Sequence, residues 1–292
     1  MSSSLRAIAL AGATFAGGIL IVALLPLKLL PWTRHLGFRG ISWVATSWAD
    51  WVRRFLRRLP IRWTIEGEQP TPDHTYMVLA NHQSWVDILA VLLAMGEGSP
   101  MPRFFMKFEL LYVPIIGLAA WGLDYPIMRR YSAEAIKANP ALKTRDLDYA
   151  RRVLSAHPEA ACVVVNFAEG TRFSDAKRQV NRSPYQHLLK PKVGGPQLAL
   201  DCLKDRIHGV VDITIDYPNG ALSLWNLLAG KIPEGHIHIR ILPVPEAFQK
   251  TLTELDELKA FRHWINGLWA DKDARLSTWR QGSAIHREGI TQ

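Results

Sequence analysis

Two short stretches of the chain combine residue types that could do chemistry. Residues 81–87 read Asn-His-Gln-Ser-Trp-Val-Asp, which places a histidine and a carboxylate five positions apart. A histidine suits general-base catalysis near neutral pH, and a carboxylate on its other ring nitrogen would fix the tautomer and stabilise the imidazolium. His82 and Asp87 are therefore a candidate catalytic pair. The alternative is structural: Ser84 caps a helix, Asp87 completes a capping box, and His82 merely lies in the turn.

The second stretch, residues 169–172, reads Glu-Gly-Thr-Arg and follows the apolar run CVVVNFA. Glycine lets the backbone turn tightly, threonine offers a hydroxyl, and arginine presents a planar fork that fits a phosphate. This stretch could therefore bind a phosphorylated substrate through Thr171 and Arg172. Alternatively, it forms a charged surface turn whose Glu–Arg pair contributes less than about 1 kcal/mol.

The hydrophobic pattern around these stretches predicts alternating strands and helices. Strands are expected at residues 61–67, 76–81, 124–128, 161–167, 210–216 and 236–244, and helices at 84–95, 144–157, 192–205 and 250–270. Residues 108–122, interrupted by Pro114 and Gly117, are expected to form a short helix or a pair of loops. This order predicts one α/β domain with a mostly parallel or mixed sheet flanked by helices. Both candidate stretches then follow the carboxyl ends of strands, where such folds bind ligands.

Composition and charge limit the class of protein. With 292 residues, 48% hydrophobic and 21% charged, the chain is not disordered, collagenous or of low complexity. A net charge of +9 favours an anionic partner, either nucleic acid or a membrane surface carrying acidic lipid. Cys162 and Cys202 are too few and too far apart for a disulfide framework or a zinc knuckle, so the main body is expected in the cytosol.

The amino-terminal part predicts attachment to a membrane. Residues 7–27 carry no charge and are long enough to cross the hydrocarbon core as a helix, so we expect a transmembrane or re-entrant segment. A buried core helix and a signal peptide are the alternatives, although a signal peptide has a shorter apolar region followed by a cleavage site.

The next segment is rich in arginine and tryptophan. Residues 36–58 predict an interfacial helix with Trp at the headgroup boundary and Arg on lipid phosphates, the alternative being an ordinary amphipathic core helix. Because positive charge stays in the cytoplasm, we expect the amino terminus outside and the catalytic domain on the cytoplasmic side of a cell inner membrane. The predicted organisation is a membrane anchor at residues 1–58 and a catalytic domain at 61–292.

Taken together, NHQSWVD and FAEGTR, about ninety residues apart, resemble motifs I and III of the glycerolipid acyltransferase family. The resemblance covers roughly residues 61–220 and includes the 1-acylglycerol-3-phosphate acyltransferases. It implies that His82 and Asp87 are catalytic. It also implies that the acceptor's phosphate and glycerol are bound by Glu169, Gly170, Thr171, Arg172, Arg130 and Lys107.

The implied reaction moves a fatty acyl group from acyl-CoA or an acyl carrier protein to the sn-2 hydroxyl of a lysophospholipid. The preferred acceptor is 1-acylglycerol-3-phosphate, giving phosphatidic acid. Three departures from the family pattern, Ala168, Asp212 and the sequence Met-Arg-Arg at 128–130, resemble a branch that includes lysocardiolipin acyltransferases. Lysophosphatidylglycerol or lysocardiolipin is therefore the alternative acceptor. No cofactor and no metal are expected.

Other candidate sites are weaker. His236 and His238 share one face of an alternating strand, which is more often a solvated face than a metal site when no third ligand is in view. Asp212 and Asp216 also share a face without a metal-ligand spacing. A membrane-anchored protein that binds anionic lipid or nucleic acid is the competing class. The chain carries no recognisable nucleic-acid-binding signature, and the arginine cluster lies beside the predicted anchor, where lipid headgroups already account for it.

Overall fold

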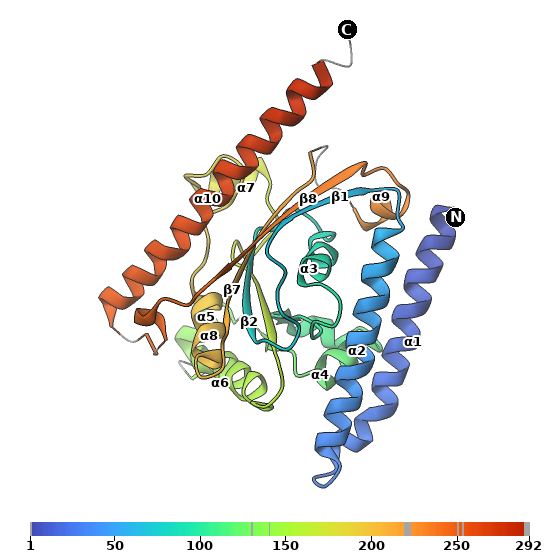
Figure 1. Ribbon diagram of the computed structural model, residues 1–292. Helices are drawn as coiled ribbons and strands as arrows, with labels where there is room; N and C mark the ends of the chain where they lie inside the picture. The colour runs from blue at the N-terminus through green and yellow to red at the C-terminus, as the bar shows by residue number, and fades with distance from the viewer. Residues whose placement is uncertain are drawn as a thin grey trace.

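A mixed sheet lies at the centre of the computed structural model, which describes residues 2–129, 131–139, 141–218, 223–249, 251–252 and 254–288. In these ranges six strands follow the order β1-β8-β7-β2-β6-β3 (Figure 1). Only the β7–β8 pair is antiparallel among the described strands of this sheet. The strands are β1 (Arg62–Gly67), β2 (Tyr76–Ala80), β3 (Arg103–Phe104), β6 (Val163–Phe167), β7 (Gly209–Asp216) and β8 (Glu234–Leu242). A separate parallel pair is formed by β4 (Met106–Lys107) and β5 (Ile127–Met128).

Helices cover both faces of the sheet, which explains why β2 and β7 are buried along their whole length. One face packs against α1 (Ser3–Leu29), α2 (Arg34–Arg57), α3 (Asp87–Met95) and α9 (Leu224–Leu228). The other face packs against α6 (Leu142–Leu154), α8 (Gly194–Leu203) and α10 (Leu255–Glu288). The remaining short helices are η1 (Phe108–Tyr112), α4 (Ile116–Gly122), α5 (Ala133–Ala138), α7 (Asp175–Val180) and η2 (Glu246–Phe248).

The predicted α/β class and mixed sheet are confirmed, and most predicted elements occur close to their expected bounds. Residues 108–122 form η1 and α4, as the interrupted pattern indicated. The closing helix differs most, because α10 begins at Leu255 and continues to Glu288, well beyond the predicted end. The pattern did not predict β3, β4, α5, α7 and α9, which are all six residues long or shorter.

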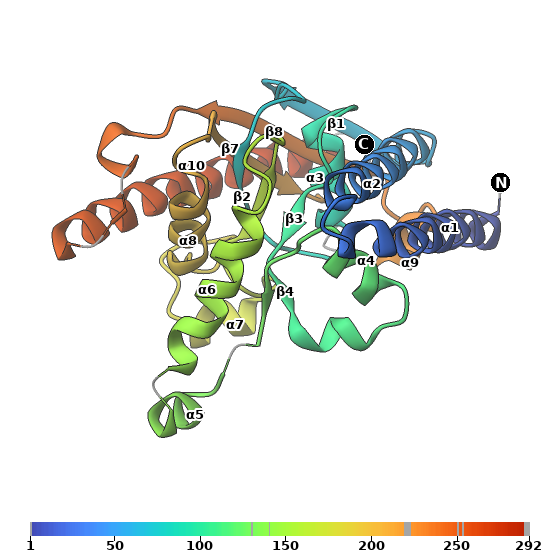
Figure 2. The same cartoon turned by 90° about the horizontal axis from the view of Figure 1, so that it is seen from below.

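The amino-terminal helices α1 and α2 form a hairpin that lies against the domain (Figure 2). At one end of α1, Arg6 Nη1 donates to the carbonyl of Leu228 at 3.0 Å. At the other end, Lys28 Nζ donates to the carbonyl of Gly122 and pairs with Asp124 at 2.8 Å. In the described residues, α1 is the one helix that is long and apolar enough to cross a membrane, although both of its ends contact the globular part.

The arginines of α2 do not all face solvent. Arg53 is fully buried, where it pairs with Asp50 and donates to the carbonyl of Leu92 at 2.7 Å. The expectation that all arginines of residues 36–58 contact lipid phosphates is therefore wrong for Arg53, whose guanidinium instead joins α2 to α3. Arg54 and Arg58 are exposed.

Candidate active site

His82 and Asp87 meet at the turn that joins β2 to α3. His82 Nδ1 lies 2.8 Å from Asp87 Oδ2, and Asp87 is fully buried. Because the ionised carboxylate only accepts hydrogen bonds, Nδ1 carries the proton in the neutral ring and the lone pair is on Nε2. The pair therefore has the arrangement of a general base held in one tautomer by a carboxylate.

The same carboxylate also organises the turn. Asp87 Oδ2 accepts hydrogen bonds from the backbone N–H groups of Gln83 and Ser84, at 2.5 and 2.7 Å. Asp87 Oδ1 accepts a bond from the Tyr217 hydroxyl at 3.0 Å. The structural and catalytic interpretations of Asp87 are thus compatible, because the carboxylate oxygen that contacts His82 also accepts the N–H groups of the turn.

The hydrogen bonds of the predicted capping box are present, but the helix begins later than expected. The Ser84 N–H donates to the Asp87 carboxylate at 2.7 Å, and the Ser84 hydroxyl accepts a hydrogen bond from the N–H of Val86 at 3.1 Å. Helix α3 itself begins at Asp87, so these two bonds close a tight turn before the helix.

Aromatic rings from neighbouring strands hold the histidine ring. His82 stacks on Phe167 with the ring centroids 4.2 Å apart, and Phe104 stacks on the same phenylalanine at 5.8 Å. The parallel register brings these residues together, since Ala80 at the end of β2 lies opposite Phe167 at the end of β6. The imidazole orientation therefore depends on three strands of the sheet.

Glu169 supports the catalytic turn from inside the protein. Its side chain is 2% exposed, and its two oxygens accept the backbone N–H groups of His82 at 2.9 Å and of Leu189 at 2.8 Å. Burial raises the pKa of Glu169 to about 8, because removal from water penalises the charged carboxylate more than the two N–H donors favour it. This geometry does not favour the expected role of Glu169 in binding the substrate. It favours a role in positioning His82, whose N–H donates to the buried carboxyl group.

Gly170, Thr171 and Arg172 lie on the outer side of the same turn. Gly170 has φ of +70°, a conformation that strains other residues. The Arg172 guanidinium is exposed and lies over the Trp85 ring at 5.3 Å, so it reaches across to the first motif. Lys177 Nζ donates to the Thr171 hydroxyl at 2.9 Å. The structure thus brings both motifs together and leaves a cationic surface beside the histidine.

The structure describes only one of the other two predicted phosphate-binding residues. Lys107 is exposed at the end of β4, outside the main sheet. Arg130 lies outside the described residues. Its neighbour Arg129 stacks over Phe108 at 4.1 Å.

A lysine that the sequence reasoning missed completes the cationic surface. A Cβ atom added to Gly170 would lie 3.2 Å from Lys192 Nζ, so the ammonium group sits directly against the second motif. The Lys192 N–H also donates to the carbonyl of Ala168 at 2.7 Å. The available signal was a lysine shortly before the pair Gly194 and Gly195, at the start of a helix.

Helix α10 is joined to β7 by two ion pairs. Lys272 is buried, pairs with Asp212 at 2.5 Å and donates to the carbonyl of Ile213 at 2.6 Å. Arg280 pairs with Asp216 at 2.8 Å. Asp212 and Asp216 therefore each form an ion pair with a residue of α10. The buried partner of Asp212, which departs from the family pattern, is Lys272.

No group of three or more His, Cys, Asp or Glu side chains suited to hold a metal occurs in the described ranges. His236 and His238 lie half-buried on β8. Burial, followed by the nearby Arg275 and Arg240, lowers the pKa of His238.

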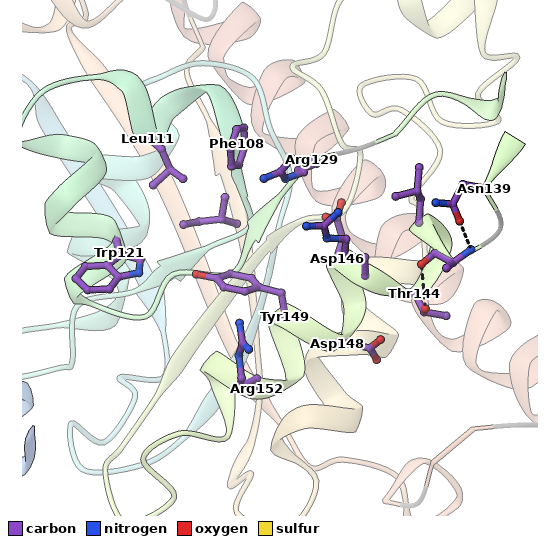
Figure 3. A pocket seen from close by; sticks show the side chains of 14 residues that line it. Phe108, Leu111, Trp121, Arg129, Asn139, Thr144, Asp146, Asp148, Tyr149 and Arg152 are labelled. Atoms are coloured by element: carbon purple, nitrogen blue, oxygen red, sulfur yellow. Dashed lines mark hydrogen bonds between the residues drawn. The ribbon is translucent and has the colours of Figure 1, made fainter. Parts of the chain in front are cut away.

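A cavity of about 970 Å³ lies at the edge formed by η1, β5 and α6. Phe108, Trp121 and Tyr149 project into it together with Arg129 and Arg152 (Figure 3). Neither member of the catalytic pair lines this cavity, so it is not the reaction centre.

Comparison with known proteins matches residues 62–217 to the acyltransferase family model. A mouse 1-acyl-sn-glycerol-3-phosphate acyltransferase gamma is 26% identical over 87% of this chain and 68% of its own length. The human gamma protein is 30% identical over 72% of this chain and 54% of its own length. A 2-acyl-1-lysophosphatidylinositol acyltransferase of Saccharomyces cerevisiae is 28% identical over 40% of this chain and 32% of its own length. The chain thus spans between about a third and two thirds of these relatives.

Among solved structures, the 1-acyl-sn-glycerophosphate (LPA) acyltransferase PlsC from Thermotoga maritima has a similar fold. The TM-score is 0.50 at 18% sequence identity, covering 92% of this chain and 98% of that chain. The mixed sheet and its helical layers are therefore shared with that protein.

Proposed function

Since this chain belongs to the acyltransferase family, we propose that it transfers a fatty acyl group from a thioester to the hydroxyl of a lysophospholipid, preferably 1-acylglycerol-3-phosphate. The observation that carries the proposal is the contact of His82 Nδ1 with the buried Asp87 carboxylate, 2.8 Å away, beside the exposed cation Arg172. The printed names of the mouse and human relatives support the acceptor class.

In the proposed reaction, His82 Nε2 removes the proton from the acceptor hydroxyl as its oxygen attacks the thioester carbonyl. The carbon–sulfur bond then breaks, and the imidazolium returns its proton to the leaving thiolate, so no acyl-enzyme forms. Asp87 holds the ring and stabilises its charged form during transfer. The donor is acyl-CoA or an acyl carrier protein.

Positioning of the acceptor phosphate supplies much of the acceleration. Arg172 offers a planar fork, Thr171 a hydroxyl and Lys192 an ammonium group, and all three lie on the outer face of the second motif. Lys107, exposed at the end of β4, belongs to the same proposed site, as Arg130 does by its resemblance to the family pattern. Glu169 and Gly170 shape the turn that carries these groups.

The hairpin of α1 and α2 is proposed to hold the enzyme at a membrane, facing the cytoplasm. With 27 residues, α1 is about 40 Å long. Both ends of α1 bond to the domain, through Arg6 and Lys28. This geometry favours a helix that lies half-embedded in one leaflet over a helix that crosses both.

An acceptor panel tests the proposal. Full-length protein in detergent is incubated with acyl-CoA and, in parallel, lysophosphatidic acid, lysophosphatidylglycerol, lysophosphatidylinositol or monolysocardiolipin, and thiol release is followed. We expect the fastest release with lysophosphatidic acid and loss of release in folded His82→Ala. If another lysolipid is preferred, the acceptor assignment is wrong. If no lysolipid supports release from acyl-CoA or from acyl carrier protein, the enzymatic proposal fails and a lipid-binding role replaces it.

A further inference from the structure

An apolar ridge projects from the domain next to the proposed phosphate site. Residues 110–123 contain fourteen consecutive uncharged residues, LLYVPIIGLAAWGL, between Glu109 and Asp124. We call residues 110–121, which span the end of η1 and most of α4, the apolar ridge. Several of its large side chains face outward: Tyr112 is 76% exposed, Ile116 50% and Leu118 48%.

The ridge is held rigidly, so its outward side chains are not a frayed core segment. Ile115 has φ of +68°, and a Cβ added to Gly18 of α1 would lie 2.1 Å from Ile115 Cγ2. Ile115 therefore fits against α1 at a position where only glycine leaves room. Gly117 is packed as closely, because an added Cβ would lie 2.2 Å from the carbonyl oxygen of Leu111. The buried side of the ridge is thus anchored, and its opposite side is left with apolar groups in the open.

Exposed apolar side chains also occur on α1, the helix against which the ridge packs. Helix α4 contacts α1, and Figure 2 shows the two lying side by side. On α1 the exposed side chains include Ile8 at 66%, Phe15 at 57% and Leu20 at 54%. Exposed apolar side chains gathered on neighbouring elements mark a membrane or protein contact site.

The surrounding charges decide between these two occupants. Lys107 is exposed and comes directly before η1, while Arg129 stacks on Phe108, the first residue of η1. Tyr112 and Trp121 lie on the ridge and are residue types that favour the boundary between headgroups and hydrocarbon. An anionic leaflet offers hydrocarbon to the apolar side chains, a headgroup boundary to Tyr112 and Trp121, and phosphates to Lys107 and Arg129.

We propose that the apolar ridge inserts into the same leaflet as α1, and that this insertion holds Lys107 at the depth of the lipid phosphates. This inference rests on the proposed function, because a lysophospholipid acceptor would then enter the site from the bilayer without leaving headgroup level. The ridge is a second membrane contact, separate from the predicted anchor at residues 1–58.

Site-specific fluorescence tests the insertion. A variant with Cys202→Ser and Ile116→Cys, full length, is labelled with an environment-sensitive fluorophore and mixed with vesicles of phosphatidylcholine and phosphatidylglycerol. We expect a blue-shifted emission that is quenched by lipids spin-labelled near the headgroup. Leu255→Cys is the matched control, because Leu255 is 68% exposed and is the first residue of α10, a helix on the other side of the sheet from α1 (Figure 1), so it should show neither change. An unchanged Ile116 label on vesicles that bind the protein overturns the proposal. Disulfide crosslinking between Ile116→Cys copies in lipid-free detergent also overturns it, because a second copy would then cover the ridge.

Kinetics separate this inference from the proposed function. Tyr112, Ile116 and Leu118 are changed together to Ser, and Leu255→Ser again serves as control. For an acceptor embedded in vesicles we expect the apparent KM to rise roughly tenfold, because apolar contacts with the leaflet are lost. For a short-chain acceptor dissolved as monomer we expect no change. An equal loss on both acceptors contradicts a membrane role for the ridge, whereas absence of activity in the unaltered enzyme contradicts the proposed function itself.

Discussion

Asp87→Asn tests the dual role of the buried carboxylate most directly. The amide that replaces the carboxylate has one accepting oxygen and one donating nitrogen. In the structure, Oδ2 faces three donors, namely the N–H groups of Gln83 and Ser84 and the Nδ1 of His82, whereas Oδ1 faces only the Tyr217 hydroxyl. The two backbone donors should hold the amide oxygen toward His82. The amide nitrogen then faces Tyr217, whose hydroxyl can turn to accept.

This orientation keeps the turn and the histidine tautomer and removes only the charge. A hydrogen bond to a charged group contributes about 1.5–3 kcal/mol, compared with about 1 kcal/mol for a neutral one. The difference is about 0.5–2 kcal/mol, and at about 1.4 kcal/mol per tenfold, loss of the charge should lower kcat by roughly 2- to 30-fold. The free energy of unfolding should change by about 1 kcal/mol or less, because each donor keeps a partner.

The assay is thiol release under saturating substrates, combined with urea unfolding of the same preparations. A kcat decrease of roughly 10⁴-fold, as expected when an amide holds a histidine in the wrong tautomer, would refute the inferred amide orientation. A kcat equal to that of the unaltered enzyme would refute the catalytic role of the charge. Ser84→Ala is the control: it should lose some stability, because the Val86 N–H loses its acceptor, and keep most of its turnover.

Three further predictions follow from neighbouring contacts. Tyr217→Phe leaves Asp87 Oδ1 without the hydroxyl that donates to it at 3.0 Å, so we expect the free energy of unfolding in urea to fall by about 1–3 kcal/mol and kcat to fall modestly. If both values are unchanged, this contact contributes neither to stability nor to turnover. Arg172→Lys and Lys192→Gln should each raise the KM for lysophosphatidic acid roughly tenfold, with little effect on the KM for acyl-CoA. Lys190→Gln, which changes an exposed lysine nearby, is the control and should leave both KM values unchanged. An equal rise of the KM for both substrates would point to a role in folding. Burial raises the pKa of Glu169 from 4.5 to about 8, so the unfolded chain releases this proton first as pH rises. The free energy of unfolding should therefore fall by up to about 1.4 kcal/mol per pH unit between these values. Glu169→Gln should flatten that slope in urea unfolding at pH 5 to 8, and identical slopes would contradict the assignment.

Much of the architecture could be predicted from the sequence because it depends on local patterns. Apolar and β-branched runs such as residues 161–167 specify buried strands, and alternation with helical periods specifies the α/β class. The contact between His82 and Asp87 was also predictable, since the two are only five residues apart and one turn joins them. The short elements escaped prediction because a strand of two residues, such as β3, has no periodicity to detect.

Only the tertiary structure shows which residues that are distant in the sequence contact the His82 turn and the second motif. Glu169 resembles a substrate ligand in the sequence, and only the pairing of β2 with β6 shows its carboxylate beneath the His82 N–H, 87 positions away. Lys192 likewise becomes a candidate only when the loop before α8 returns to Gly170.

Burial of charge was equally hidden. Arg53 belongs to a basic run whose composition suits a membrane surface, yet its contact with the Leu92 carbonyl places it in the interior. The sequence by itself determined the type and order of the longer elements and the turn that joins His82 to Asp87, because those depend on contacts between near neighbours. Which charged groups are buried, and which face a substrate or a membrane, was decided by the packing of helices against the sheet, because desolvation depends on neighbours that are distant along the chain.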